Sequence, residues 1–146
     1  MRATPLVLLA ALLAGCAGGA RGASVVAPLV TDPDVEATVS AVVETAVADD
    51  ARGAADSLYA PGALVVSDGA TRGAAPRLAS MQAGGEAAVA SSQVSVREGF
   101  AWALVEYRWV NPSANAVRVG RATLLLAPRR DGAGWWIIHA HSSSVR

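Results

Sequence analysis

The residues best suited to chemistry lie toward the C-terminal end of the chain, in two segments where apolar and polar side chains alternate. In the first segment, residues 100–110, Glu106 is a carboxylate among apolar neighbours. A carboxyl group buried in an apolar interior holds its proton more tightly and can act as a general base, so Glu106 is a candidate catalytic residue. An ion pair with Arg108 or Arg121 on the surface is the alternative, and it is the interpretation that we favour.

Two histidines lie two residues apart in the second segment, residues 135–144. In an extended strand His139 and His141 share one face, where they could hold a metal ion between them. No cysteine and no nearby pair of carboxylates completes such a site, and we therefore expect no metal. Hydrogen bonding of both rings within the sheet is the interpretation that we favour, although His139 is also a candidate general base.

No other motif indicates a reaction. The chain has no HExxH sequence and no glycine-rich phosphate loop after a predicted strand. Its other prominent acids lie where helix caps and turns favour aspartate: Asp49, Asp50, Asp56, Asp68 and Asp131. We therefore expect no cofactor.

The N-terminal residues 1–15 have the layout of an export signal, with a charged start, an apolar run and small residues at the exit. The apolar run, residues 6–13, is far shorter than the ~20 residues that span a bilayer. It ends in Leu13-Ala14-Gly15-Cys16, which contains the only cysteine of the chain.

This tetrapeptide resembles a bacterial lipobox. The resemblance implies that the signal peptide is removed before Cys16 and that Cys16 carries the lipid. Because Ala17 and not aspartate follows the cysteine, it also implies a place in the cell envelope at the outer membrane, facing the periplasm. An ordinary cleaved signal peptide with a chance cysteine is the alternative.

The rest of the chain predicts a tether and one domain. Residues 16–31 are rich in glycine and alanine and predict a flexible tether with a span of roughly 20 Å. Residues 32–146 are long enough for one domain with one core. The 12 basic residues are all arginine and balance 12 acidic residues. A neutral chain without a basic cluster is not expected to bind nucleic acid.

The pattern of apolar residues predicts an α+β fold, in which three N-terminal helices pack on one face of a curved antiparallel sheet. Caps and helical periodicity predict three helices: residues 33–48, 51–58 and 73–82. A short strand is expected at 63–67. A period of two then predicts four more strands: residues 87–98, 100–110, 117–128 and 135–144.

These segments resemble the nuclear transport factor 2-like superfamily, in particular its SnoaL-like and calcium/calmodulin-dependent kinase II association-domain branches. The best match is the last strand, Arg130-Asp131-Gly132 followed by Trp135-x-Ile137-x-His139-x-His141-x-Ser143. Weaker matches are Asp56-Ser57-Leu58-Tyr59-Ala60 and Asp68-Gly69 before Arg72-Gly73. The resemblance covers about residues 33–144. It implies a cone-shaped domain with a pocket at its open end, and usually a dimer formed through the sheet.

The residues that we expect around such a pocket are mostly aromatic or histidine: Tyr59, Trp102, Glu106, Trp136, His139 and His141. In the association domains, ligand-binding arginines occupy positions that resemble Glu106, Leu125 and Ser142 here. Because this chain lacks those arginines, the resemblance does not imply that it binds a carboxylate ligand.

Three functions follow as hypotheses. The first is a lipid-anchored envelope protein whose domain binds a small apolar or amphipathic ligand or forms a homodimer. The alternative is an isomerase, dehydratase or cyclase that uses Glu106 or His139 as general base. The third is a passive domain whose cone is filled by its own side chains, such as Trp102 and Trp136.

Overall fold

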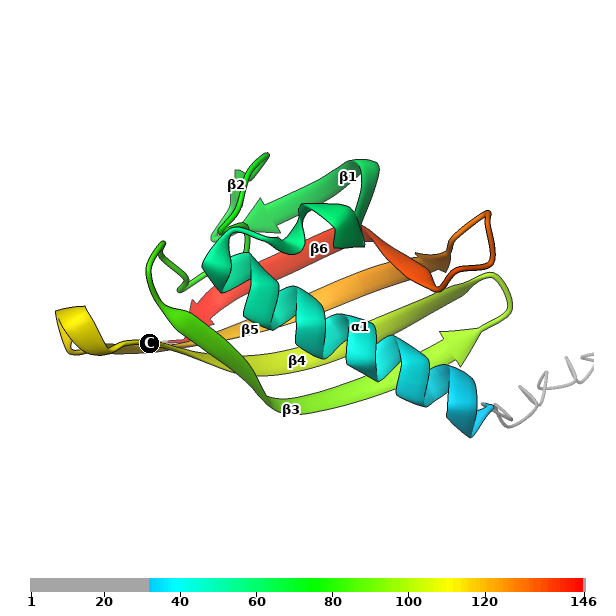
Figure 1. The fold of residues 1–146 in the computed structure, drawn as a ribbon, viewed down its shortest axis with the longest axis horizontal. Helices are drawn as coiled ribbons and strands as arrows, with labels where there is room; N and C mark the ends of the chain where they lie inside the picture. Colours follow the sequence, from blue (N-terminus) through cyan, green and yellow to red (C-terminus); the bar gives the residue numbers. More distant parts are fainter. Residues whose placement is uncertain (1–31, 146) are drawn as a thin grey trace, which may run out of the picture.

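The computed structural model describes residues 32–145, in which one long helix lies across a six-stranded sheet (Figure 1). The predicted signal peptide, the lipidated Cys16 and the tether lie outside the described residues. Within the described range, no helix is both long enough and apolar enough to span a membrane.

The helix α1 (Pro33–Arg52) begins where the sequence predicts it. The Asp32 side chain accepts a hydrogen bond from the N–H of Asp34, and Pro33 occupies the first helical position. The helical periodicity of the apolar residues is confirmed, since Val39, Val43, Ala46 and Val47 form a buried stripe, which Ala51 extends beyond the predicted end of the helix. The helix does not stop at Asp49-Asp50 as predicted, because Gly53 in the left-handed conformation (φ 76°) ends it instead.

The prediction of three helices is wrong, since α1 is the only α-helix among the described residues. The second predicted helix is reduced to the 3-10 turn η1 (Ala55–Leu58). The third predicted helix is an irregular segment, residues 72–85, which we call the strap. Proline and glycine disfavour a helix there, and buried N–H groups of the strap bond to side chains of other elements instead of to carbonyls four residues earlier.

The sheet is curved and mixed, in the order β2-β1-β6-β5-β4-β3. Its strands are β1 (Tyr59–Ser67), β2 (Ala70–Thr71), β3 (Glu86–Arg97), β4 (Phe100–Asn111), β5 (Ala116–Pro128) and β6 (Trp135–Val145). A 3-10 turn, η2 (Pro112–Ala114), connects β4 to β5. The meander β3–β6 is antiparallel as predicted, but β1 pairs with β6 in parallel. The antiparallel prediction is therefore wrong for this pair.

The faces of β4 follow the predicted alternation, whereas those of β6 do not. In β4, Ala101, Ala103, Val105, Tyr107 and Trp109 are buried against α1 and the strap. In β6, the register shifts because Leu126 pairs with Ile137 but Leu125 pairs with His139, which leaves Ile138 as an extra residue. This bulge turns Ile137 inward and leaves His139 and His141 together on the outward side of the strand. The two histidines therefore share a face as predicted, but Ile137 does not share it with them.

Two glycines make room for the largest side chains of the core. Tyr107 and Trp109 are fully buried and reach from β4 to the strap. A Cβ atom at Gly120 would overlap the Tyr107 ring, and one at Gly85 would overlap the Trp109 indole. The interior is therefore filled by Tyr107 and Trp109, and not by Trp102 and Trp136.

Candidate functional site

A cluster of polar side chains is buried between α1, β1 and the strap. It consists of Asp50, Tyr59 and Arg77, which are 0%, 7% and 8% exposed, and we call it the buried polar cluster. The Asp50 Oδ2 accepts hydrogen bonds from the backbone N–H groups of Arg77 (2.7 Å) and Leu78 (2.8 Å). The Arg77 guanidinium lies 4.7 Å from the centre of the Tyr59 ring and forms an ion pair of 2.5 Å with Asp56.

Each member of this cluster has a polar atom without a hydrogen-bond partner in the described structure: Asp50 Oδ1, Tyr59 Oη and Arg77 Nη1. The Nη1 of Arg77 lies 3.8 Å from the Oδ1 of Asp50, too far for a hydrogen bond. Burial raises the pKa of Asp50 from its usual 3.8, although the two backbone N–H groups and the charge of Arg77 oppose this shift. Burial likewise raises the pKa of Tyr59, which is therefore neutral at pH 7.

Two serines and two aromatic side chains hold the strap next to the cluster. The Ser67 hydroxyl donates to the carbonyl of Arg77, and its Oγ lies 2.9 Å from the Oγ of Ser142. The Ser142 hydroxyl in turn accepts a hydrogen bond from the N–H of Ala79. The Tyr107 hydroxyl donates to the Ala79 carbonyl at 2.6 Å. Trp109 donates from its indole N–H to the Gln82 carbonyl at 3.1 Å.

Sequence reasoning missed Asp50 because aspartate near a helix end is usually a cap. A signal was nevertheless present, since Asp50 lies three residues after Val47 and seven after Val43, in line with the buried stripe. Ser142 was missed because the bulge in β6 could not be foreseen.

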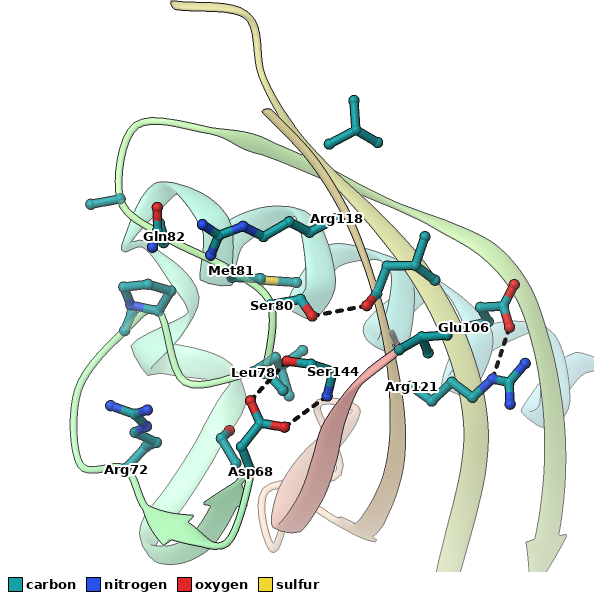
Figure 2. Close-up of a pocket in the computed structure, with 18 of the residues that line it drawn as sticks. Asp68, Arg72, Leu78, Ser80, Met81, Gln82, Glu106, Arg118, Arg121 and Ser144 are labelled. Carbon is teal, nitrogen blue, oxygen red and sulfur yellow. Dashed lines mark hydrogen bonds and ion pairs between the residues drawn. The ribbon is translucent and has the colours of Figure 1, made fainter. Parts of the chain in front are cut away.

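A cleft of about 1090 Å³ separates the strap from the ends of β5 and β6 (Figure 2). At its lower end, Asp68 accepts hydrogen bonds from the N–H (2.7 Å) and hydroxyl (2.8 Å) of Ser144. Across the cleft, the Ser80 hydroxyl donates to the Val119 carbonyl at 2.8 Å. Arg118 also lies in this wall, with its guanidinium 5.4 Å from the centre of the Trp109 ring. The lining is mostly polar, with charges of both signs.

The sheet face opposite α1, which we call the outer face, carries most of the predicted site residues. Glu106 forms an ion pair of 2.9 Å with Arg121, so the surface pairing that the sequence favoured is the one observed. Both residues and His141 line a shallow groove of about 530 Å³. His139 lies one row away, opposite Leu125.

The two predicted tryptophans also lie away from the interior. Trp102 stacks on Phe100 with ring centres 5.8 Å apart. Trp136 alternates with the buried Ile137 and is covered by Arg129, whose guanidinium lies 4.7 Å from its ring. Tyr59 is in the buried polar cluster and borders a separate pocket of about 360 Å³. The residues predicted to line one pocket therefore lie in two places, with Tyr59 in the buried polar cluster and the other five on the outer face.

Within residues 32–145, no three histidine, cysteine, aspartate or glutamate side chains gather closely enough to hold a metal ion. His139 and His141 remain a pair on the outer face.

No family model and no curated protein matches the chain, but solved structures do. A protein from Xanthomonas campestris assigned as a calcium/calmodulin-dependent protein kinase II association domain is 17% identical, with a TM-score of 0.55 over 81% of this chain and 91% of that one. A nuclear transport factor 2-like protein of unknown function from Silicibacter pomeroyi is 18% identical, with a TM-score of 0.52 over 79% of this chain and 99% of that one.

The association domain of the C. elegans kinase is 10% identical, with a TM-score of 0.50 over 76% of this chain and 93% of that one. At these identities the similarity shows the fold alone. The described domain has the nuclear transport factor 2-like α+β fold, as the sequence predicted.

Proposed function

We propose that the domain is an association module that forms a homodimer through the outer face of its sheet. The observation that carries this proposal is the contrast between the two faces. The inner face is covered by α1 and the strap, whereas the outer face leaves Leu64, Phe100 and Leu104 exposed by 49%, 41% and 48%. Large exposed apolar side chains grouped on one face are typical of interaction sites. The names of two similar structures, which are association domains, agree with this proposal.

The partner that fits this face is a second copy of the chain. Leu104 lies opposite Thr123 on the neighbouring strand, and the row next to it is Glu106 opposite Arg121. A face that carries an exposed leucine beside an acidic and a basic group can be self-complementary when it meets its own copy about a two-fold axis. Dimerisation would bury Leu104 and bring the Glu106–Arg121 pair of each copy close to the other copy.

Size-exclusion chromatography with light scattering, on residues 17–146, tests the dimer. Leu104→Arg places a charge where the exposed leucine would be buried and is expected to weaken self-association at least tenfold, since a buried unpaired charge costs several kcal/mol. Ala41→Arg, on the exposed side of α1, is the matched control and should leave the mass unchanged. A wild-type chain that is a monomer at 100 µM would refute the proposal.

We further propose that Cys16 is lipidated and anchors the protein in the cell envelope at the outer membrane. The lipobox-like sequence supports this. Expression of the full chain in a bacterium should place it in the membrane fraction with a mass increase on the N-terminal peptide. Cys16→Ala should release it from that fraction, whereas Ala17→Ser should not. A wild-type chain without added mass at Cys16 would contradict the anchor.

Small-molecule binding is a second candidate function, favoured by the cleft beside the strap, whose volume is in the range of ligand pockets. Native mass spectrometry of the mildly purified domain tests it by detecting a retained molecule. The enzyme alternative has less support, because the Glu106 carboxylate already pairs with Arg121 and His139 lies on the outer face rather than at the floor of a pocket.

A further inference from the structure

The backbone of the strap is held largely by side chains that belong to other elements, while its own Ser80 bonds to β5 and its Leu78 and Met81 pack into the core. Within residues 72–85, the backbone N–H of Arg72 donates to the carbonyl of Val65, and short turns lie at residues 79–80 and 83–84. Further along the strap, hydrogen bonds of the backbone go to side chains of α1, β1, β4 and β6: Asp50, Ser67, Tyr107, Trp109 and Ser142. A segment held in this way can detach without breaking the sheet or the helix.

Asp50 is the one anchor in this set that changes charge at ordinary pH. Serine and tryptophan do not titrate there, and burial raises the pKa of Tyr107 so that its hydroxyl stays neutral. Asp50 also accepts two of the bonds, from adjacent N–H groups of the strap. Its charge state therefore bears directly on whether the strap is closed.

The charges around Asp50 do not balance it when it is ionised. The strap contributes Arg77, η1 contributes Asp56, and β1 and β4 contribute the hydroxyls of Tyr59 and Tyr107. On its own helix, Asp49 and Arg52 pair with each other. Arg77 pairs with Asp56 and lies 3.8 Å from Asp50 Oδ1, so one cation faces two carboxylates.

A carboxylate oxygen that is ionised, fully buried and without a hydrogen-bond partner is unfavourable, because water would solvate it better. Opening of the strap would admit that water. We propose that the strap is a lid that stays closed over the buried polar cluster while Asp50 holds a proton, and that opens more often once Asp50 has lost it. The opened state would widen the cleft that the strap borders.

The direction of the pH dependence follows from the linkage between proton binding by Asp50 and closure of the strap. Because burial raises the pKa of Asp50 in the closed state, protons favour closure, and the fraction of open strap increases as the pH rises. Each unit by which the closed-state pKa exceeds that of an exposed aspartate corresponds to about a tenfold change in the ratio of closed to open strap.

Amide hydrogen exchange on the full chain in detergent tests the lid, with each rate divided by the intrinsic rate at the same pH. The N–H groups of Arg77 and Leu78 should lose protection between about pH 4 and pH 7.5. The N–H groups of Leu124 and Leu126 in β5 should not. Asp50→Asn can accept both hydrogen bonds without a charge and should give strap protection that does not change with pH. Asp131→Asn, the matched control, removes an exposed carboxylate in the loop between β5 and β6 and should keep the pH dependence.

Strap protection that is independent of pH in the wild type, or equally pH-dependent in Asp50→Asn, would overturn the proposal. So would exchange of strap and β5 amides at one common rate, since that would be global unfolding. Should Asp50→Asn fail to fold, limited proteolysis of the wild type decides, with a broad-specificity protease whose rate on an unfolded peptide is measured at each pH for normalisation. Normalised cleavage within the strap should increase from about pH 4 to pH 7.5, and a constant normalised rate contradicts the lid.

Discussion

Replacement of Gly120 by alanine tests whether the interior is as closely filled as the structure indicates. A methyl group at this position would overlap the Tyr107 ring, which is fully buried and cannot turn toward solvent. Overpacking of a core costs about 1–3 kcal/mol, and displacement of Tyr107 also breaks its hydrogen bond to Ala79, worth about 1 kcal/mol. We expect Gly120→Ala to lower the free energy of unfolding by about 2–4 kcal/mol.

Urea denaturation followed by tryptophan fluorescence measures this change. Gly73→Ala is the matched control, because open space surrounds that position, and its effect should lie within about 1 kcal/mol of zero. In a Tyr107→Leu background, the cost of Gly120→Ala should fall below about 1 kcal/mol, since the overlapping ring is gone. If Gly120→Ala costs no more than Gly73→Ala, or costs the same in both backgrounds, the reasoning is refuted.

Three further predictions concern polar and aromatic groups. Burial raises the pKa of Asp50, so the folded chain holds its proton more tightly than the unfolded chain does. The contribution of Asp50 to stability is therefore most favourable near pH 4 and falls as the pH rises through the folded-state pKa. Over that range the free energy of unfolding of Asp50→Asn, measured by urea denaturation, should increase relative to that of the wild type. Glu106→Gln should change stability by less than about 1 kcal/mol, because its ion pair with Arg121 is largely exposed, and a larger loss by urea denaturation would contradict this. Trp109→Phe removes the donor to the Gln82 carbonyl and leaves a gap beside Gly85, and should destabilise the domain by about 1–3 kcal/mol in the same assay.

The parts of the fold that depend on local pattern could be predicted. The cap at Asp32, the proline after it and the apolar steps of α1 are properties of a few neighbouring residues, and the structure has the helix there. Strand β4 alternates in the sequence and in the structure, because a regular strand presents every second side chain to the same face.

The strap shows where local pattern misleads. Residues 73–82 resemble a short helix in composition, yet the N–H groups of Arg77 and Leu78 bond to Asp50, which precedes them by 27 and 28 residues. Such partners are far away along the chain, and no window of neighbouring residues contains them. The same holds for Tyr107 and Ser142, which meet the strap only because the sheet brings them there.

The candidate site was divided for a related reason. Sequence spacing placed Ile137 with His139 and His141, but one bulged residue, Ile138, reverses the faces of β6 between them. A bulge depends on how β6 fits β5, and alternation in one strand cannot reveal it. The surface pair of Glu106 and Arg121 could be named as an alternative, but only the register of β4 against β5 made it the observed one.

By itself, the sequence determined the first helix, the strand meander, the general α+β class and the lipobox-like N-terminus, because each depends on residues close together in the chain. Only the tertiary structure decided that Asp50 is buried, that the strap replaces a helix and that both histidines face outward. These features depend on hydrogen bonds and strand register between residues far apart in sequence, and their energies exist only once the sheet has formed.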